Sequence, residues 1–340
     1  MKTRLLSFLA GVFAVLLMLE IAFQILPVAT ATRSGYYQHP LILSYPAGHC
    51  FISSTGWDLK NAQRNCANNI GFLAGRDFLP DRNAIGLIGD SYVEASMLPV
   101  GQRLGAMLEN KLAGRPVYAF GGPGSNLLDY AERAKFAAEK FGIRTFVFIL
   151  ERGDIKQAQC GSGHIHGVCV DTVTGRIRTE TQAQPGALKR ILRHSALAQY
   201  LVSQLKFDLS KLKPSAWSAP AVTKSSLQAG VSDELQNATV NAFFSQISKI
   251  QNSRLVFVVD PDRGHLLEAG AGERNEVAER IQQAGAGQVT VIDPGSAFKE
   301  HLVRTGRLLD VGPYDRHWNA EAIGIVAELA GNALIAPEHK

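Results

Sequence analysis

The sequence has no run rich in lysine or arginine, no internal repeat and no low-complexity tract. Its 35 Lys and Arg residues only slightly exceed its 30 Asp and Glu residues, so a net charge of +5 is spread thinly over 340 residues. A nucleic-acid motif is also lacking, and we expect no nucleic-acid partner. The Gly-x-Gly matches lack the rest of the dinucleotide fingerprint and its acidic partner, which argues against a dinucleotide cofactor.

Cysteine is scarce as well, with four residues in the chain, while 46% of the residues are hydrophobic and 19% are charged. This is an ordinary globular composition, and the length is ample for a buried core. A typical domain size predicts about two domains, or one large domain with insertions and a tail.

Only one apolar stretch, residues 5–28, is long enough to cross a membrane, and Glu20 and Gln24 interrupt it. Lys2 and Arg4 precede this stretch. A basic flank followed by an apolar stretch targets a chain to a membrane and keeps the positive end in the cytoplasm. We therefore expect the rest of the chain to be exported, to the periplasm or the extracytoplasmic face of the inner membrane.

Two fates of residues 1–31 stay open, an uncleaved membrane anchor and a cleaved signal peptide. The length favours the anchor, because the apolar cores of signal peptides are shorter, about 7 to 15 residues. Ala29-Thr30-Ala31, however, matches the small-x-small cleavage pattern, and Glu20 would place a charge inside the span. We favour the anchor, and with it a membrane contact through the N-terminal segment.

The cysteines agree with export, because an even number of cysteines in an oxidising compartment suggests disulfides. Cys160 and Cys169 bracket a Gly-rich segment, so a local bridge between them is natural, and Cys50 would then pair with Cys66. Other pairings stay open. A rival interpretation is a metal site in which His164 and His166 join the neighbouring cysteines, but the spacing matches no recognised zinc module.

Short apolar runs alternate with helical patterns in the second part of the chain. Residues 32–83 have little periodicity and are expected to form an irregular lead-in. Residues 84–338 are expected to form the main domain, with an insertion at about 155–230 that includes a helical part at 187–212. The expected strands are residues 84–88, 116–120, 145–150, 255–259 and 289–292, and the expected helices are 101–112, 127–141 and 320–335.

Apolar strands that alternate with helices predict a parallel sheet covered on both faces. About five such strands predict an α/β fold, a three-layer sandwich with flavodoxin-like strand order. Ligands bind such folds at the carboxyl ends of the strands. The insertion leaves the strand that ends at Leu150 from that edge, so we expect it to shape the substrate cleft.

Ser91 is the first candidate for chemistry, within Gly89-Asp90-Ser91-Tyr92. A serine that directly follows a strand has its hydroxyl exposed at the end of the sheet, and its backbone N–H can bind an oxyanion. The second candidate is Asp315-Arg316-His317, just before the final helix. Histidine is the usual base for a serine nucleophile, and a carboxylate fixes the tautomer of that histidine. Each motif alone also suits an ordinary turn or surface pair, but together they predict a triad.

These motifs resemble the conserved blocks of the SGNH/GDSL hydrolases. Gly89-Asp90-Ser91-Tyr92 is similar to the first block, and Asp315-Arg316-His317 is similar to the last. A last block in which Trp318 follows the His is similar to the one in periplasmic SGNH-like proteins of polysaccharide O-acetylation, such as the alginate O-acetyltransferase group. The segment 121–126 resembles the second block, whose glycine gives a backbone N–H to the oxyanion hole, and Gly124 matches it best. The resemblance spans about residues 84–335 and implies the SGNH hydrolase fold.

The third block of the family departs from this pattern. The family has Gly-x-Asn-Asp after a strand, and its Asn helps to hold the oxyanion. This sequence has Glu151-Arg152-Gly153-Asp154, so Gly153 stands where the Asn is expected. Arg152 or Asn126 is a candidate replacement, although a salt-bridged strand end explains Arg152 equally well. Asp262 and Arg263 follow another strand and are further candidates for the cleft, although a turn explains them better.

The sequence therefore predicts an exported serine esterase or O-acyl transferase that acts on acyl esters, and the resemblance implies a carbohydrate substrate. Ser91 is the expected nucleophile, His317 the base and Asp315 its partner, with the N–H groups of Ser91 and Gly124 as the oxyanion hole. Such chemistry requires no metal or organic cofactor. The alternative is a catalytically inactive SGNH-like protein that binds glycans or assists assembly, which the Gly153 departure motivates.

Overall fold

The computed structural model describes residues 2–30, 36–39, 41–162, 167–180, 186–207, 233–267, 275–313 and 315–336. The chain divides into two compact units, and each is described by itself. Unit 1 comprises Met1–Arg33, Cys50–Cys66 and Ala183–Lys224, and unit 2 comprises Ser34–His49, Ala67–Gln182 and Ser225–Lys340. Unit 1 thus takes part of the expected lead-in and part of the expected insertion, which the sequence boundaries did not separate.

A five-stranded sheet of entirely parallel strands forms the centre of unit 2. Its spatial order is β11-β10-β7-β5-β6, which is 2-1-3-4-5 when the five strands are numbered along the chain and read from β6. This is the flavodoxin-like order, so the predicted architecture is confirmed. The strands are β5 (Ile85–Gly89), β6 (Val117–Gly121), β7 (Thr145–Leu150), β10 (Arg254–Val259) and β11 (Val289–Ile292).

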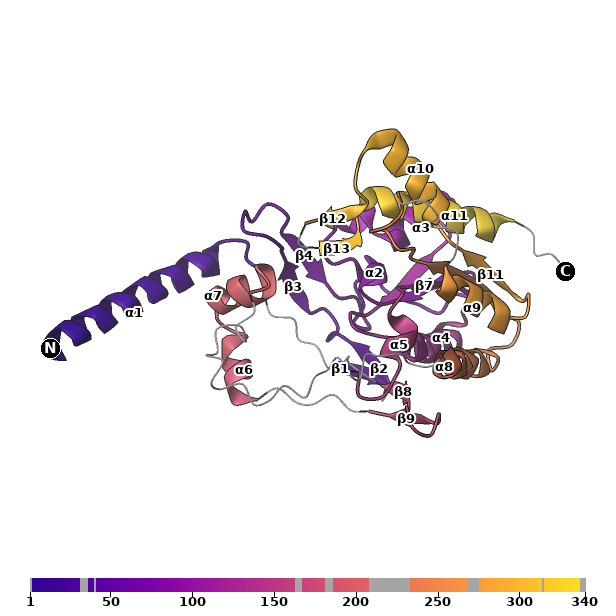
Figure 1. Ribbon diagram of the computed structural model, residues 1–340, viewed down its shortest axis with the longest axis horizontal. Coiled ribbons are helices and arrows are strands. Elements are labelled where there is room, and N and C mark those ends of the chain that lie inside the picture. The colour runs from indigo at the N-terminus through magenta and orange to yellow at the C-terminus, as the bar shows by residue number, and fades with distance from the viewer. Residues whose placement is uncertain are drawn as a thin grey trace. The chain divides into compact units, whose positions relative to one another are not determined.

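Helices cover both faces of this sheet, and Figure 1 shows one group on each side. Alternate strand residues point to opposite faces, so Ile88 and Phe148 pack under one group while Leu87 and Val147 pack under the other. The first group is α4 (Leu127–Phe141), α8 (Asp233–Ile247) and α9 (Glu276–Ala284). The second group is α3 (Leu104–Lys111), α10 (Gly295–Thr305) and α11 (Ala320–Ile335).

Shorter elements complete unit 2, and several lie in the lead-in that the sequence predicted to be irregular. Backbone pairing explains this difference, because hairpins of three or four residues are too short for a period-2 pattern to register. These elements are β1 (Tyr36–His39), β2 (Ile42–Ser44), α2 (Ser91–Glu94), a 3₁₀ turn (Val100–Gln102), α5 (Asp154–Gln157), β8 (Val168–Val170), β9 (Ile177–Thr179), β12 (Asp310–Gly312) and β13 (Asp315–Trp318).

Unit 1 contains a long apolar helix, a hairpin and a short helical segment. They are α1 (Lys2–Ile25), β3 (Cys50–Ser53), β4 (Gln63–Cys66), α6 (Ala187–Leu192), α7 (Ala196–Gln199) and a π-helical turn (Tyr200–Gln204). The helix expected over residues 187–212 is therefore broken between α6 and α7, where Ser195 caps a new helix, and its last residues lie outside the described part. By length and composition, α1 is suited to cross a membrane or to serve as a signal sequence.

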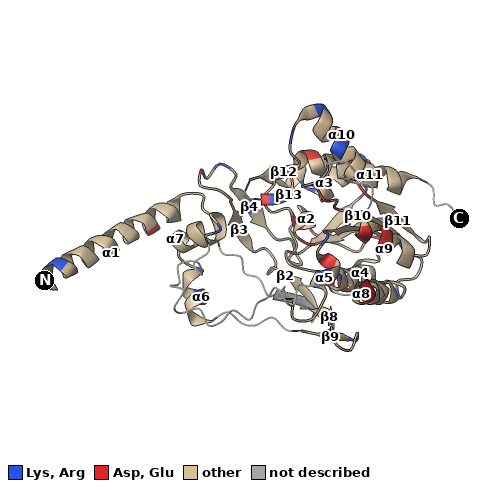
Figure 2. Cartoon of the chain, in the orientation of Figure 1, with Lys and Arg blue, Asp and Glu red and all other residues tan. Residues whose placement is uncertain are grey.

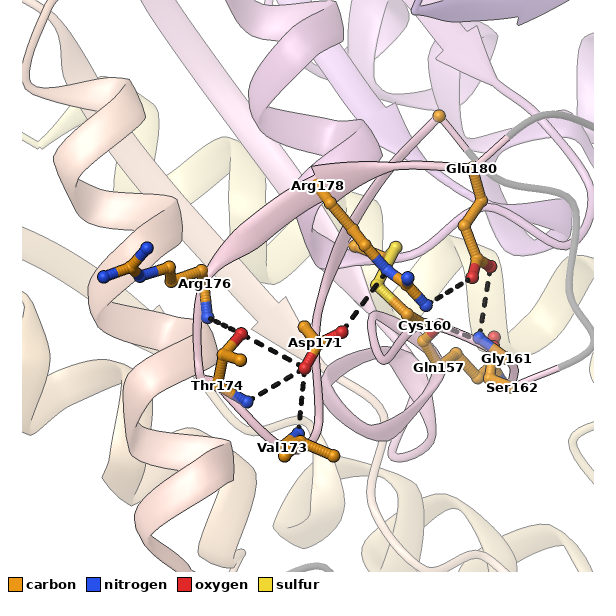
Figure 3. The surroundings of a disulfide bond; sticks show 12 residues. Gln157, Cys160, Gly161, Ser162, Asp171, Val173, Thr174, Arg176, Arg178 and Glu180 are labelled. Carbon is orange, nitrogen blue, oxygen red and sulfur yellow. Dashed lines mark hydrogen bonds and ion pairs between the residues drawn. A yellow bond between two sulfur atoms is a disulfide. The ribbon is translucent and has the colours of Figure 1, made fainter.

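The two disulfides join Cys50 to Cys66 and Cys160 to Cys169. This is the pairing that the sequence suggested. Neither cysteine of a pair offers a thiolate, so the rival metal site loses its sulfur ligands, and His164 and His166 lie outside the described residues. Next to the Cys160–Cys169 bridge, a turn is closed by the Asp171 carboxylate, which accepts backbone N–H bonds from Val173 and Thr174 (Figure 3).

Candidate active site

Ser91 is the first residue of α2, directly after β5 and one intervening residue, Asp90. Asp90 caps the helix, because its Oδ1 accepts the backbone N–H of Tyr92 at 2.8 Å. The strand–cap–helix arrangement leaves Ser91 at the carboxyl end of β5. In this strand order the topological switch point lies between β5 and β7. Open α/β sheets bind ligands there, outside the carboxyl ends of the strands.

Asp315 and His317 lie on β13, and the structure brings them to Ser91 across 226 positions of sequence. The Nε2 of His317 is 2.7 Å from the Oγ of Ser91. The Nδ1 of the same ring is 2.5 Å from the Oδ1 of Asp315. The three side chains form one continuous hydrogen-bonded relay, with the geometry of a nucleophile, a base and the carboxylate that orients the base.

Arg263 supports this relay from the end of β10. Its guanidinium bonds the Tyr92 hydroxyl at 2.7 Å and the Arg316 carbonyl oxygen at 2.5 Å, and it also pairs with Asp310. It therefore joins the residue after Ser91 to the hairpin that carries His317. The sequence placed Arg263 near the cleft but gave no sign of this role, because its partners come from separate loops.

A buried carboxylate, Asp260, bonds both Arg263 and Trp318. It accepts a bond from the Trp318 indole Nε1 at 2.6 Å and from the Arg263 Nε at 3.1 Å. Burial raises the pKa of Asp260 to about 6, against the opposing effect of the Arg263 charge. Trp318 is buried and packs edge-on against the Tyr92 ring, with the ring centroids 5.0 Å apart. The Tyr92 ring in turn lies 5.0 Å from the His317 ring, so aromatic contacts fix the base laterally.

The charges around His317 favour its protonated form. Burial by itself lowers the pKa of His317, but the hydrogen bond and charge of Asp315, together with the charge of Asp90, outweigh burial and raise the pKa above its usual value. The Arg263 charge acts in the opposite direction. Asp90 is itself a buried group, and desolvation raises the pKa of its carboxyl despite the bond from Tyr92.

We expect ester hydrolysis to depend on pH through His317. A general base must be neutral to accept the Ser91 proton, and a raised pKa keeps His317 protonated to a higher pH. The kcat/KM of the wild-type chain should therefore rise with pH, with a midpoint above about 6.5, the ordinary histidine value. Initial rates on a neutral ester between pH 5 and 9 measure this. A midpoint below the ordinary value contradicts the assignment.

The backbone N–H groups of Ser91 and Gly124 are the two predicted donors of the oxyanion hole. Within the described part of the chain, neither the N–H of Ser91 nor that of Gly124 donates a hydrogen bond to another group. Gly124 has a φ of +72°, a left-handed conformation that glycine adopts without steric cost. The segment 122–125 is a turn in which Gly122 accepts bonds from Ser125, so the position of Gly124 is fixed by its neighbours.

Two side chains crowd the position at which the Asn of the family is expected. A side chain built at Gly153 would put its Cβ 2.6 Å from the Nε2 of Gln157 and 2.6 Å from the Oε2 of Glu151, which already accepts the Gly153 N–H at 2.6 Å. The Glu151 carboxylate accepts hydrogen bonds, whereas the Gln157 amide can donate them. The sequence identified the departure at Gly153 but neither of these two side chains.

The adjoining Asp154 is fully buried. Its Oδ2 accepts the Tyr130 hydroxyl at 2.9 Å and the Glu151 N–H at 2.8 Å. Burial, with the charges of Asp90 and Glu151, raises its pKa well above the ordinary aspartate value. Asp154 thus joins the end of β7 to α4 through hydrogen bonds to Glu151 and Tyr130.

The two candidate replacements for the Asn donor have other partners. Asn126 is fully buried, and its Oδ1 accepts the N–H groups of Leu128 and Asp129 as the cap of α4. Arg152 is half-exposed and pairs with Asp262. The structure thus gives Asn126 a capping contact and Arg152 the salt bridge that the sequence offered as the alternative.

No family model matches the chain, and no curated protein matches it. Solved structures to which the chain is similar include a lipolytic G-D-S-L family member from Veillonella parvula, at 11% identity and a TM-score of 0.40 over 74% of this chain and 97% of that one. A lipase/acylhydrolase from Enterococcus faecalis has 14% identity and a TM-score of 0.39 over 76% and 100%. A carbohydrate esterase with catalytic and non-catalytic binding functions has 10% identity and a TM-score of 0.35 over 77% and 67%. At these values the functional argument rests on the geometry of this chain.

We expect Arg263→Met to slow ester hydrolysis by displacing the relay. Displacements of about 1 Å at a catalytic group cost about 10²-fold, so kcat should fall by about that factor while KM changes little. Because the Arg263 charge lowers the pKa of His317, its removal should also move the pH profile to higher pH. Arg176→Met, at an exposed position on the β8–β9 turn, is the matched control. A lower yield of folded protein with an unmoved pH profile would indicate a structural role only.

Proposed function

We propose that this chain is a serine-nucleophile ester hydrolase or O-acyl transferase that acts on acyl esters. The observation that carries the proposal is the unbroken relay from Ser91 through His317 to Asp315. The Tyr92 ring lies against His317, Arg263 bonds the Tyr92 hydroxyl, and within the described residues the N–H groups of Ser91 and Gly124 have no other acceptor.

In the first half-reaction, Ser91 Oγ attacks the acyl carbon while His317 Nε2 accepts its proton. Asp315 orients the ring and stabilises the imidazolium. The carbonyl oxygen becomes an oxyanion, to which the N–H groups of Ser91 and Gly124 donate. The tetrahedral intermediate then collapses, His317 returns the proton to the leaving alcohol, and an acyl-enzyme on Ser91 remains.

In the second half-reaction an acceptor hydroxyl attacks the acyl carbon while His317 Nε2 takes its proton. The bond between the acyl carbon and Ser91 Oγ then breaks, and His317 returns the proton to Ser91 Oγ. Water as acceptor gives an esterase, and a sugar hydroxyl gives a transferase. We propose a carbohydrate as the substrate, supported by the motifs around Ser91 and Trp318. These steps require only the side chains and backbone groups of the chain itself.

We further propose that the reaction takes place outside the cytoplasm. The chain has two disulfides, and disulfides form and persist in oxidising compartments outside the cytoplasm. The apolar α1 with basic residues at its start supports the same placement, with the active unit on the exported side.

A fluorophosphonate probe tests the nucleophile directly, because it phosphonylates an activated serine hydroxyl. The folded wild-type chain should take up one label, on the peptide that contains Ser91. Heat-unfolded protein and Ser91→Ala should take up none, and His317→Ala should label far more slowly. A wild-type chain that remains unlabelled would falsify the nucleophile assignment.

The second candidate is a protein of the same fold that binds glycans without turnover, and the absence of the family's Asn at Gly153 favours it. Losing one oxyanion donor costs about 10²–10³ in kcat, which a slow enzyme tolerates. Hydrolysis of p-nitrophenyl acetate separates the two. Activity that disappears in both Ser91→Ala and His317→Ala supports the enzyme, whereas retention of polysaccharide without any turnover or label supports the binding protein.

A further inference from the structure

The far end of α1 is built into unit 1 rather than free of it. The Glu20 carboxylate accepts three hydrogen bonds at the start of α7: from the Ser195 hydroxyl at 2.7 Å, the Ala196 N–H at 2.8 Å and the Leu197 N–H at 3.0 Å. One helix turn later, the Phe23 ring stacks on the Tyr200 ring at 4.4 Å. The charge that interrupts the apolar stretch is therefore the group that joins α1 to residues 195–200.

The chain just beyond α1 continues this attachment. Ala29 is buried, and its N–H bonds the Oε1 of Gln204 at 3.1 Å. Gln204 is fully buried, and its amide also donates to the Gly56 carbonyl at 2.8 Å. Thr30 exchanges bonds with Ile52 of the β3–β4 hairpin at 2.9 Å. Cleavage after Ala31 would remove the contacts of Ala29 and Thr30 and leave the buried Oε1 of Gln204 without the Ala29 N–H, so the attachment favours a retained α1.

The length of α1 fixes the depth at which this attachment would lie. At about 1.5 Å per residue, a helix that starts to cross at Thr3 brings Glu20 about 26 Å along its axis, near the far border of a hydrocarbon core of about 30 Å. Figure 2 shows the basic colour at the start of α1 and the acidic colour farther along it. By sequence, Glu20 lies five residues before the end of α1 at Ile25. Positive residues stay in the cytoplasm, so Glu20 and the start of α7 would meet the exported border of the bilayer.

The segment that this attachment holds has the surface of an interfacial helix. In α6, Leu188 is 70% exposed and Ile191 is 68% exposed. Three basic residues accompany them within one and a half turns, namely Lys189, Arg190 and Arg193. Exposed apolar side chains beside Lys and Arg are the composition of segments that lie in the headgroup layer, where the apolar groups enter the acyl boundary and the cations meet phosphate.

We propose that residues 187–207 dock on the anionic headgroup layer of the exported leaflet, beside a retained α1. Unit 1 then contacts the membrane in two ways: α1 crosses the bilayer, and residues 187–207 lie on its surface. The choice of lipid as the occupant follows from continuity with α1 and from the charge of α6. Val202 and Phe207, both exposed, extend the apolar surface through the segment. This proposal does not depend on the chemistry of Ser91.

Retention is tested by the mass of the native chain extracted from membranes. The expected mass is that of a chain that keeps residues 2–31. A mature chain that begins at Thr32 overturns the proposal. A second experiment uses Glu20→Leu to test the attachment of α1 to α7. This variant keeps α1 apolar but removes all three bonds to residues 195–197. It should increase hydrogen exchange at 195–204 in the full chain, while Gln246→Leu, on α8 of unit 2, should not.

Surface docking is tested with an indole reporter in the full chain in nanodiscs of anionic lipid. In a background of Trp57→Phe and Trp217→Phe, Ile191→Trp should lose fluorescence when the acyl chains are brominated near the headgroup. Val303→Trp, at a position 72% exposed on α10, gives the background quenching of an exposed indole outside unit 1. Changing Lys189, Arg190 and Arg193 to Gln should reduce the quenching at 191. Quenching at 191 no greater than that at 303 overturns the proposal, and protection of 191 only in native membranes would indicate a protein partner instead.

Discussion

Replacing Ser91 by alanine should reduce ester hydrolysis by about 10⁵–10⁶-fold in kcat, the scale seen when the nucleophile of a serine relay is removed. The physical reason is that no other described hydroxyl lies within hydrogen-bonding distance of His317 Nε2, so no other group can form the acyl-enzyme. Initial rates with p-nitrophenyl acetate measure the loss. Whatever rate persists would come from the oxyanion hole and substrate binding alone.

The matched control is Ser162→Ala, an exposed serine on the Cys160–Cys169 segment that should keep the wild-type rate. The double variant of Ser91→Ala with His317→Ala should be no slower than Ser91→Ala, because the two side chains act as one unit. Losses that multiply in the double variant would show that the two residues act independently. A Ser91→Ala rate equal to wild type would remove the nucleophile from the proposal altogether.

Asp315→Asn should lower kcat by about 10⁴-fold, although the change is nearly isosteric. The carboxylate accepts a hydrogen bond from the Nδ1–H of His317, and this tautomer leaves Nε2 free to accept the proton of Ser91. An amide can present its own N–H to Nδ1, which places the histidine proton on Nε2 and blocks the base. Steady-state kinetics of ester hydrolysis measure the fall, and the rate of fluorophosphonate labelling should fall in parallel.

The same variant makes a prediction about pH. The Asp315 bond and charge raise the pKa of His317, so Asp315→Asn should move the residual pH profile to lower pH. This shift is opposite in direction to the one expected for Arg263→Met. Asp262→Asn is the control, since Asp262 is partly exposed and pairs with Arg152 and His265 away from the relay. Equal effects of Asp315→Asn and Asp262→Asn would contradict the role of Asp315.

The fold was accessible from the sequence because buried parallel strands carry their signal locally. The five strand predictions each match an observed strand to within one or two residues, since runs such as 145–150 are apolar on both faces. The hairpins of the lead-in were missed, because three or four residues with mixed burial give no period. The helix expected at 187–212 was also misjudged, since the capping contacts at Ser195 that divide it involve Glu20, far away in the sequence.

Some residues of the candidate site also have a local signal in the sequence, and others have none. Ser91 was identifiable because it follows a strand within a short motif, and His317 because it lies two residues after an Asp before a final helix. The sequence did not predict the contacts of Arg263 and Glu151. The first bonds groups from two distant loops, and the second bends over a glycine, and neither arrangement leaves a pattern in the neighbouring residues.

The sequence by itself determined the secondary structure that carries the chemistry, the apolar N-terminal segment and the residue types of the relay. Local periodicity and short motifs encode these features, because each depends on neighbours a few residues apart. Only the tertiary structure decided that Ser91 and His317 meet at 2.7 Å, which side chains crowd the position of the absent Asn, and that Glu20 joins α1 to α7. Such contacts depend on strand order and side-chain packing between distant segments, and no local pattern contains that information.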